Sequence, residues 1–219
     1  MGSGAYGHVW KVTDKKSGEV LALKKIFDAF QHSTDAQRTY REIVFLHELN
    51  HPNIIKLSNV IKADNEKDLY LVFEYMEADL HNAIGQKILK DAHNRYILYQ
   101  IVKALKFMHS AEVIHRDLKP SNLLLNSDCH LKICDFGLAR SLAVDRNDVK
   151  DNVLTEEVAT RWYRAPEVLL GSNFYDKSAD IWSVGCILAE IFIGKPIFPG
   201  NSTLNQLERI LSFTGKPKP

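Results

Sequence analysis

The sequence predicts an α+β fold in two lobes, a small strand-rich lobe over residues 1–75 and a larger, mainly helical lobe over residues 76–219. Short apolar runs typical of strands, at residues 20–24 and 69–73, lie in the first third. Farther along, apolar residues recur every three or four positions between residues 97 and 108, the spacing of a helix. With 219 residues, 45% of them hydrophobic, the chain can bury a sizeable core.

The charge and the cysteine content of the chain indicate which partners and which cellular compartment to expect. The formal net charge is only +1 and the basic residues are scattered, which argues against nucleic acid or an anionic membrane as a partner. Three cysteines without paired or metal-type spacing favour a reducing compartment, the cytoplasm or the nucleus. The longest apolar run, residues 181–193, is too short to span a bilayer, so we expect a buried helix. We expect no signal peptide, because a glycine-rich segment follows Met1 directly.

That glycine-rich segment, residues 2–9, has the spacing G-x-G-x-x-G-x-V. Glycines at Gly2, Gly4 and Gly7 would let backbone amides cover phosphates without side-chain clashes. The spacing also occurs in dinucleotide-binding folds, but there a strand precedes it and a helix follows. A strand-type pattern follows here, which excludes the dinucleotide alternative.

The next strand carries Lys24 at the end of the apolar run 20–24. About half of lone strand lysines are plain surface residues, but a helical pattern over residues 36–46 places Glu42 within possible reach. A buried ammonium needs a carboxylate partner, and such a pair would orient the phosphates of a nucleotide. After the strand at 69–73 we expect a hinge and a short helix, and then the long helix that contains residues 97–108.

The most informative stretch is His-Arg-Asp-Leu-Lys-Pro-Ser-Asn at residues 115–122, followed by Asp-Phe-Gly at 135–137. It supplies a candidate base (Asp117), a cation for a phosphate (Lys119) and two oxygen ligands for a metal (Asn122 and Asp135), as phosphoryl transfer from magnesium-ATP requires. Charged residues that solvate a turn would explain a single Asp, but not both motifs at this spacing. Their order resembles that of protein kinases.

Further segments narrow the resemblance. Residues 155–167, Thr-Glu-Glu-Val-Ala-Thr-Arg-Trp-Tyr-Arg-Ala-Pro-Glu, resemble the activation segment of mitogen-activated protein kinases, and residues 195–200 resemble a segment shared with cyclin-dependent kinases. Residues 27–30, 34–39 and 202–208 resemble the atypical extracellular-signal-regulated subgroup, its seventh and eighth members. The resemblance covers essentially the whole chain and implies the bilobal protein kinase fold.

The resemblance also implies roles for single residues. Asp117 would accept or orient the proton of the substrate hydroxyl, Lys119 would steady the transferring phosphoryl group, and Asn122 and Asp135 would hold Mg²⁺. The catalytic set that it implies is Asp117, Lys119, Lys24, Glu42 and Thr160.

For the nucleotide, the resemblance implies an adenine sandwiched between apolar side chains and hydrogen-bonded along its edge by hinge backbone. Ordinary core packing remains the alternative for the apolar positions. The implied ATP-binding residues are Gly2, Gly4, Gly7, Val9, Ala22, Lys24, Phe73 as gatekeeper, Glu74, Met76, Asp79 at the ribose, Asn122, Leu124 and Asp135.

Regulation departs from the family pattern, in which both residues of a Thr-x-Tyr motif are phosphorylated. Glu157 stands at the second position, which leaves Thr155 for an upstream kinase or for autophosphorylation. Glu157 either partly replaces the phosphotyrosine or is a tolerated change. The implied phosphate-binding residues are Arg41, Arg116 and Arg140 for Thr155, and Arg161 and Arg164 for the second position.

Both ends also depart from the family. We expect truncation before the glycine-rich segment and after Pro219, with the loss of C-terminal helices that would bring an Arg to a buried Glu167. Two functional classes stay open. One is an active kinase that phosphorylates Ser or Thr before Pro in protein substrates, and the other is a nucleotide-binding pseudoenzyme or dominant-negative regulatory fragment.

Overall fold

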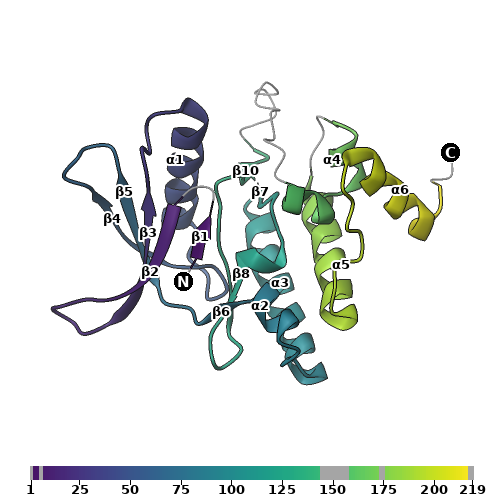
Figure 1. Cartoon of the computed structure of the whole chain (residues 1–219), viewed down its shortest axis with the longest axis horizontal. Helices are drawn as coiled ribbons and strands as arrows, with labels where there is room; N and C mark the ends of the chain where they lie inside the picture. Colours follow the sequence, from purple (N-terminus) through teal and green to yellow (C-terminus); the bar gives the residue numbers. More distant parts are fainter. Residues whose placement is uncertain (1, 5–6, 144–157, 173–175, 217–219) are drawn as a thin grey trace.

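A computed structural model describes residues 2–4, 7–143, 158–172 and 176–216 and shows two lobes side by side (Figure 1). The first lobe contains a five-stranded antiparallel sheet in the order β1-β2-β3-β5-β4, with one long helix beside it. Its elements are β1 (Gly2–Gly4), β2 (Gly7–Thr13), β3 (Val20–Ile26), α1 (Ser33–Glu48), β4 (Leu57–Lys62) and β5 (Leu69–Glu74).

The register of this sheet gathers the predicted nucleotide-binding side chains on one face. Val9 of β2 lies opposite Lys24 of β3, and Ala22 lies opposite Phe73 of β5. Because side chains alternate along a strand, Ala22 and Lys24 share a face. This face of the sheet therefore combines the apolar side chains of Val9, Ala22 and Phe73 with the ammonium groups of Lys24 and of Lys11, which lies opposite Ala22.

The second lobe is mainly helical, as the sequence predicts. Its centre is the pair of contacting helices α3 (Asp91–Ser110) and α5 (Lys177–Ile193). The predicted stripe on α3 is core, since Ile97, Ile101, Leu105 and Met108 are all buried. The remaining helices are α2 (Leu80–Gly85), the 3₁₀ turns η1 (Pro120–Asn122) and η2 (Val158–Tyr163), α4 (Pro166–Leu169) and α6 (Thr203–Thr214).

Two small antiparallel sheets line the side of this lobe that carries the loops. One has the order β6-β8-β9, with β6 at Ala78–Asp79, β8 at Leu123–Leu125 and β9 at Leu131–Ile133. The other pairs β7 (Val113–Ile114) with β10 (Arg140–Ser141). The hairpin of β8 and β9 holds the segment 115–122 and the segment 135–137 next to each other.

Polar side chains set several helix ends. Asp176 precedes α5 and accepts a hydrogen bond from the backbone of Ser178, whereas Ser202 caps α6 through the backbone of Asn205. Gly194 ends α5 with a φ of 79°, a left-handed conformation that glycine adopts without steric cost.

Buried amides join the two lobes. The Nδ2 atom of Asn53, after α1, donates to Gln100 Oε1 at 3.0 Å and to the carbonyl oxygen of Leu131 at 2.9 Å. The carbonyl oxygen of Asn53 accepts from the backbone of Ile133 at 2.9 Å. These bonds fix the position of α1 and the sheet relative to the loops of the helical lobe.

Two expectations from the sequence need correction. The run 181–193 is helical, but Ile181, Phe192 and Ile193 are exposed, because only one face of α5 packs against the core. Glu167 is half-buried rather than buried, because it lies in α4, a short helix without any buried residue. Within the described part of the chain, no helix combines the length and the apolar character needed to cross a membrane.

Candidate active site

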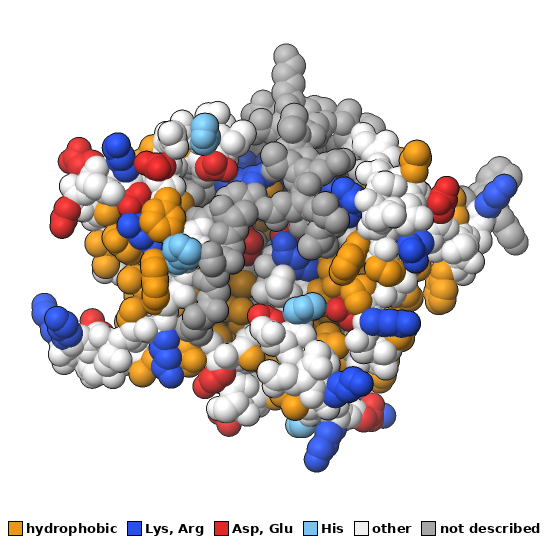
Figure 2. All heavy atoms as spheres, in the orientation of Figure 1, with side chains coloured by type: hydrophobic (Ala, Val, Ile, Leu, Met, Phe, Trp, Pro, Cys, Tyr) orange, Lys and Arg blue, Asp and Glu red, His pale blue; other side chains and the backbone are white. Residues whose placement is uncertain are grey.

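A cavity of about 420 Å³ lies between the lobes. It is lined by residues of β2, β3 and α1 and of the loops around residues 117 and 135–138. On the outer face of the molecule seen in Figure 2, charges of both signs are interspersed. The lining of the cavity includes six residues predicted for the site: Gly7, Val9, Lys24, Glu42, Asp117 and Asp135.

Lys24 and Glu42 form an ion pair in this cavity. The ammonium Nζ lies 2.8 Å from Glu42 Oε2 and 3.0 Å from Oε1, so both carboxylate oxygens are engaged. Burial lowers the pKa of Lys24, but the charges of Glu42 and Asp135 outweigh it and raise the pKa of the ammonium above its usual range. Lys24 is therefore a fixed positive charge inside the cavity.

Asp117 is the carboxylate around which the loop 115–122 is organised. Its Oδ2 accepts from Lys119 Nζ at 2.9 Å and from Asn122 Nδ2 at 3.2 Å. Its Oδ1 is buried and has no hydrogen-bond partner among the residues that the structure describes. Burial raises the pKa of Asp117, although Lys119 opposes the shift. One oxygen of a buried carboxylate is thus available to a ligand.

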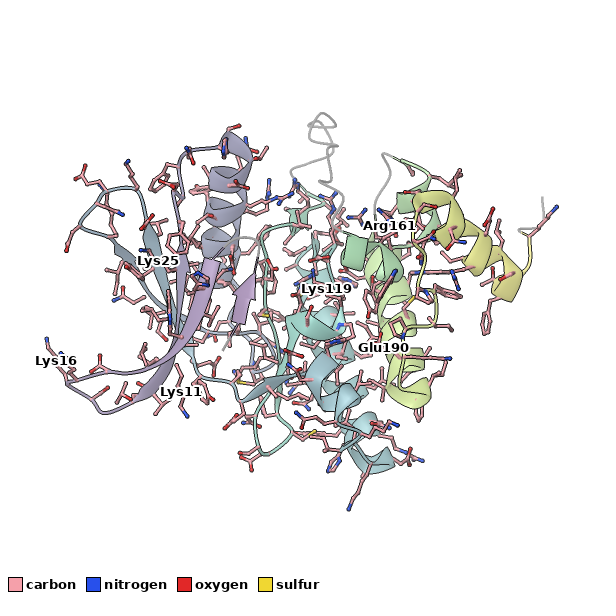
Figure 3. The ribbon with its side chains drawn as sticks, in the orientation of Figure 1. Lys11, Lys16, Lys25, Lys119, Arg161 and Glu190 are labelled. Atoms are coloured by element: carbon pink, nitrogen blue, oxygen red, sulfur yellow. The ribbon has the colours of Figure 1, made fainter. Side chains whose placement is uncertain are left out.

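Asp135 lines the same cavity as Asp117, and its backbone lies in the left-handed region with a φ of 65°. Burial would raise the pKa of Asp135, but the charges of Lys24 and Lys119 lower it overall, which keeps the carboxylate ionised. Figure 3 shows Lys119 on the side of the helical lobe that faces the strand-rich lobe. A positive φ in a residue other than glycine is uncommon, and such strain concentrates at functional sites.

Asn122 and Asp135 fit a magnesium ion by their chemistry. Asn122 uses its amide nitrogen to donate to Asp117 at 2.9 Å and 3.2 Å, which leaves the amide oxygen for a metal. An amide oxygen, one carboxylate and the oxygens of a phosphate are the hard donors that Mg²⁺ prefers, since it is usually held by one or two protein ligands together with the substrate.

A buried carboxylate of α5 holds the backbone of the loop 115–122. Asp180, 1% exposed, accepts from the backbone amides of His115 and Arg116 at 2.9 Å each, and its Oδ2 lies 2.9 Å from Nε2 of His109. Asp180 is not among the residues predicted from the sequence. An aspartate directly before a long apolar run was the available signal, because a charge there needs a buried partner.

The segment η2 is bound to α5 in a similar way. The hydroxyl of Tyr163 donates to Glu190 Oε2 at 2.6 Å, and the hydroxyl of Ser183 donates to the carbonyl oxygen of Tyr163 at 2.7 Å. Glu190 is only 1% exposed, and Figure 3 shows it on α5, on the helical lobe. Ser183 and Glu190 both lie within the apolar run 181–193, and neither was predicted as a partner of this segment.

Of the residues predicted around the adenine, Val9 lines the cavity, whereas Ala22, Phe73, Met76 and Leu124 are not in its described lining. Phe73 and Met76 are buried, and Leu124 pairs in register with Asp79. Both carboxylate oxygens of Asp79 accept hydrogen bonds from Asn82 and cap α2, an arrangement that the sequence analysis did not foresee. The side chain of Glu74 accepts from the backbone of Lys56 at 2.8 Å and pairs with Lys132 at 2.9 Å.

The regulatory predictions are only partly placed. Thr155 and Glu157 lie outside the described residues, and Thr160 is described in its backbone alone. Arg41 donates to the carbonyl oxygen of Gly137 at 2.9 Å and Arg140 to that of Ala139 at 3.0 Å, so both arginines bind the backbone after Asp135. Arg161 is buried, and Arg116 has a left-handed backbone with a φ of 70°.

Comparison with known proteins confirms the resemblance stated from the sequence. The model of the protein kinase domain matches residues 1–217. The chain is 65% identical to mitogen-activated protein kinase 15 of Xenopus laevis, over 99% of this chain and 37% of that protein. It is 64% identical to extracellular signal-regulated kinase 2 of Dictyostelium discoideum, over 99% of this chain and 59% of that protein. It is 56% identical to extracellular signal-regulated kinase 7 of Drosophila melanogaster, over 97% of this chain and 24% of that protein.

The chain therefore spans between about a quarter and three fifths of the length of these relatives. The domain model covers nearly all of its residues, and the paired motifs of the cavity fall inside the matched region. The chain belongs to the protein kinase family.

Proposed function

We propose that this chain carries the catalytic site of a serine/threonine protein kinase. It would transfer the γ-phosphoryl group of ATP to the hydroxyl of a Ser or Thr residue that directly precedes a proline in a protein substrate. The observation that supports this most directly is the environment of Asp117, whose Oδ1 is buried and lacks a hydrogen-bond partner among the described residues, while Lys119 and Asn122 hold Oδ2. A base in this setting, opposite the Lys24 ammonium, suits a hydroxyl that attacks a phosphate.

In the proposed reaction, the substrate hydroxyl donates a hydrogen bond to Asp117 Oδ1. The hydroxyl oxygen forms a bond to the γ-phosphorus as the bond from that phosphorus to the β-phosphate oxygen breaks, so ADP leaves and the proton passes to Asp117. The raised pKa of Asp117 favours proton acceptance. Lys119, 2.9 Å from Asp117, lies where it can offset charge on the transferring group.

Lys24 and the metal site act on the other phosphates in this proposal. Lys24, oriented by Glu42, binds phosphate oxygens of ATP. Asn122 and Asp135 hold Mg²⁺, which when bound neutralises part of the phosphate charge. Lys24 lies on β3 and Glu42 on α1, and Asp180 holds the backbone just before Asp117 by two hydrogen bonds, which supports a site organised before the nucleotide arrives.

The proposed regulation uses a single phosphate on Thr155. It would bring a charge of about −1.5 to −2 to the arginine cluster, where Arg41 and Arg140 already bind the backbone of the segment after Asp135. Thr155 is phosphorylated either by an upstream kinase or by this kinase itself. Mass spectrometry of Thr155 after incubation with magnesium-ATP alone separates these two sources.

The proposed location is the cytoplasm or the nucleus. Cys129, Cys134 and Cys186 are all free thiols in the structure, as expected for a protein kept in a reducing compartment.

The proposed function is tested with purified protein, magnesium-ATP and a generic basic protein, followed by identification of the phosphorylated amino acids. We expect phosphoserine and phosphothreonine. A pair of peptides that differ only in Pro or Ala after the target serine should show faster transfer to the Pro peptide. Tight binding of ATP without any transfer would instead support the alternative of a nucleotide-binding pseudoenzyme.

A further inference from the structure

A closed ring of hydrogen bonds joins η2 to α6. The indole Nε1 of Trp162 donates to the carbonyl oxygen of Gly200 at 2.9 Å, and the backbone amide of Gly200 donates to Gln206 Oε1 at 2.9 Å. Gln206 Nε2 then donates to the carbonyl oxygen of Trp162 at 3.4 Å. Figure 1 shows α6 packed against α4 at the end of α5, and α6 also contacts η2.

The chemistry of the ring determines how the Gln206 side chain must face. A backbone N–H can only donate, so the atom facing Gly200 is the amide oxygen, and the amide nitrogen then faces a carbonyl that can only accept. Gln206 is 0% exposed, so water cannot take over either bond. The backbone N–H of Gly200 also donates to the carbonyl oxygen of Phe198 at 3.0 Å, so a side chain without the amide would chiefly deprive the Trp162 carbonyl of its donor.

Gly200 is required for this ring to close. A Cβ atom at Gly200 would lie 2.5 Å from Gln206 Oε1 and 2.6 Å from Gln206 Cα, distances that real Cβ atoms do not show. The close approach of the two backbones is thus built into the sequence, and it brings α6 within reach of Trp162.

We propose that Gln206 is a positioning residue for the peptide substrate, which holds the backbone of η2 at Trp162 in the conformation that binds the peptide. The inference rests on the proposed function and on the resemblance to mitogen-activated protein kinases, which implies that residues 158–164 form the substrate loop. Tyr163 is already held on its other side by Ser183 and Glu190 of α5. The α5 bonds and the α6 ring therefore fix adjacent residues of the loop from two directions.

The position of this ring separates its effect from chemistry. None of Trp162, Gly200 and Gln206 belongs to the described lining of the cavity that holds Lys24, Asp117 and Asp135. Loosening η2 should weaken peptide binding and leave ATP binding unchanged. A general loss of stability would change both.

The test compares steady-state kinetics of the full-length protein with its Gln206→Met variant, which has a similar shape but lacks both polar atoms. We expect the KM for a Ser-Pro peptide to rise about tenfold, as loss of buried hydrogen bonds predicts, while the KM for ATP stays within about twofold. Trp162→Phe removes the hydrogen bond from the indole to Gly200 and keeps an aromatic side chain, so it should raise the peptide KM by less.

Ile210→Ala is the matched control, because Ile210 is buried on the same helix and takes no part in the ring. It should lower the melting temperature without a rise in peptide KM. An unchanged peptide KM in Gln206→Met, or an equal rise in Ile210→Ala, would overturn the inference. If Gln206→Met does not fold, Trp162→Phe decides by the same criterion. Absence of any transfer by the wild-type protein would count against the proposed function instead, and peptide affinity measured by titration would then test the ring by the same comparison.

Discussion

Two buried glutamates, Glu42 and Glu190, differ in the group that donates hydrogen bonds to their carboxylates. Glu42, 6% exposed, receives two hydrogen bonds from the Lys24 ammonium, at 2.8 Å and 3.0 Å. Glu190, 1% exposed, receives a 2.6 Å hydrogen bond from the neutral hydroxyl of Tyr163, and its Oε1 lies 4.0 Å from the imidazole Nδ1 of His81. The first glutamate orients a charge toward a cavity, whereas the second fastens a loop to the core.

This difference shows how one lobe can use a carboxylate for ligand binding and the other for architecture. A buried ion pair leaves the cation with hydrogen-bonding capacity for an anionic ligand, because Lys has three donors and Glu42 uses two. A carboxylate bonded to a phenol has no such spare cation. Changes at the Glu42 pair should therefore affect phosphoryl transfer, and changes at the Glu190 pair should affect stability.

The largest effect is expected from Lys24→Met. It removes the ammonium that contacts the phosphates in our proposal and leaves Glu42 buried without its cation, so we expect turnover to fall by about 10²- to 10³-fold. Circular dichroism should show an intact fold. Turnover close to the wild-type value would contradict the role of the pair.

The next largest effect is expected from Asp135→Asn, in the same cavity. The change replaces an ionised carboxylate, the stronger magnesium ligand, by a neutral amide. We expect ATP affinity measured by calorimetry to fall by roughly tenfold in the presence of magnesium and to change little in its absence. Equal affinities of wild type and variant with magnesium would remove Asp135 from the metal site.

A smaller effect, on stability, is expected from Tyr163→Phe. It removes the hydroxyl that donates to Glu190 and leaves a buried carboxylate oxygen unsatisfied, at a cost of about 1–3 kcal/mol in the free energy of unfolding. Urea denaturation measures this difference. The KM for ATP should not change. A loss of ATP affinity as large as that expected for Asp135→Asn would show that the Glu190 pair also affects nucleotide binding.

The smallest effect is a dependence on pH. Burial raises the pKa of Glu190 above its ordinary value of 4.5, so its ionisation is harder in the folded chain than in the unfolded chain. Stability from this group is present below pH 4.5 and is lost as the pH rises through the folded pKa. Relative to wild type, Glu190→Gln should become more stable as the pH rises from 4.5 toward 7. A stability difference that stays constant with pH would show that Glu190 titrates normally.

The sequence predicted the parts of the site whose signal is local. Asp117, Lys119 and Asn122 fall within six residues of one another, and the glycine spacing at residues 2–9 is equally local. The pairing of Lys24 with Glu42 was also predicted, because a lysine in an apolar strand requires a carboxylate.

The residues that support the site could not be predicted in this way. Asp180, Glu190 and Gln206 contact loops that lie 27 to 65 residues away along the chain, and a helical pattern records only apolar spacing. The capping role of Asp79 was missed because its role was taken from the resemblance alone.

The most direct test of the account is the single-turnover rate of phosphoryl transfer from bound ATP in the Asp117→Asn variant. Asparagine keeps the shape of the side chain but cannot accept the proton. We predict that transfer slows by about 10²- to 10⁴-fold while ATP affinity, measured on the same sample, stays at the wild-type value. Transfer at a rate within a few-fold of wild type would show that Asp117 is not the base of this kinase site.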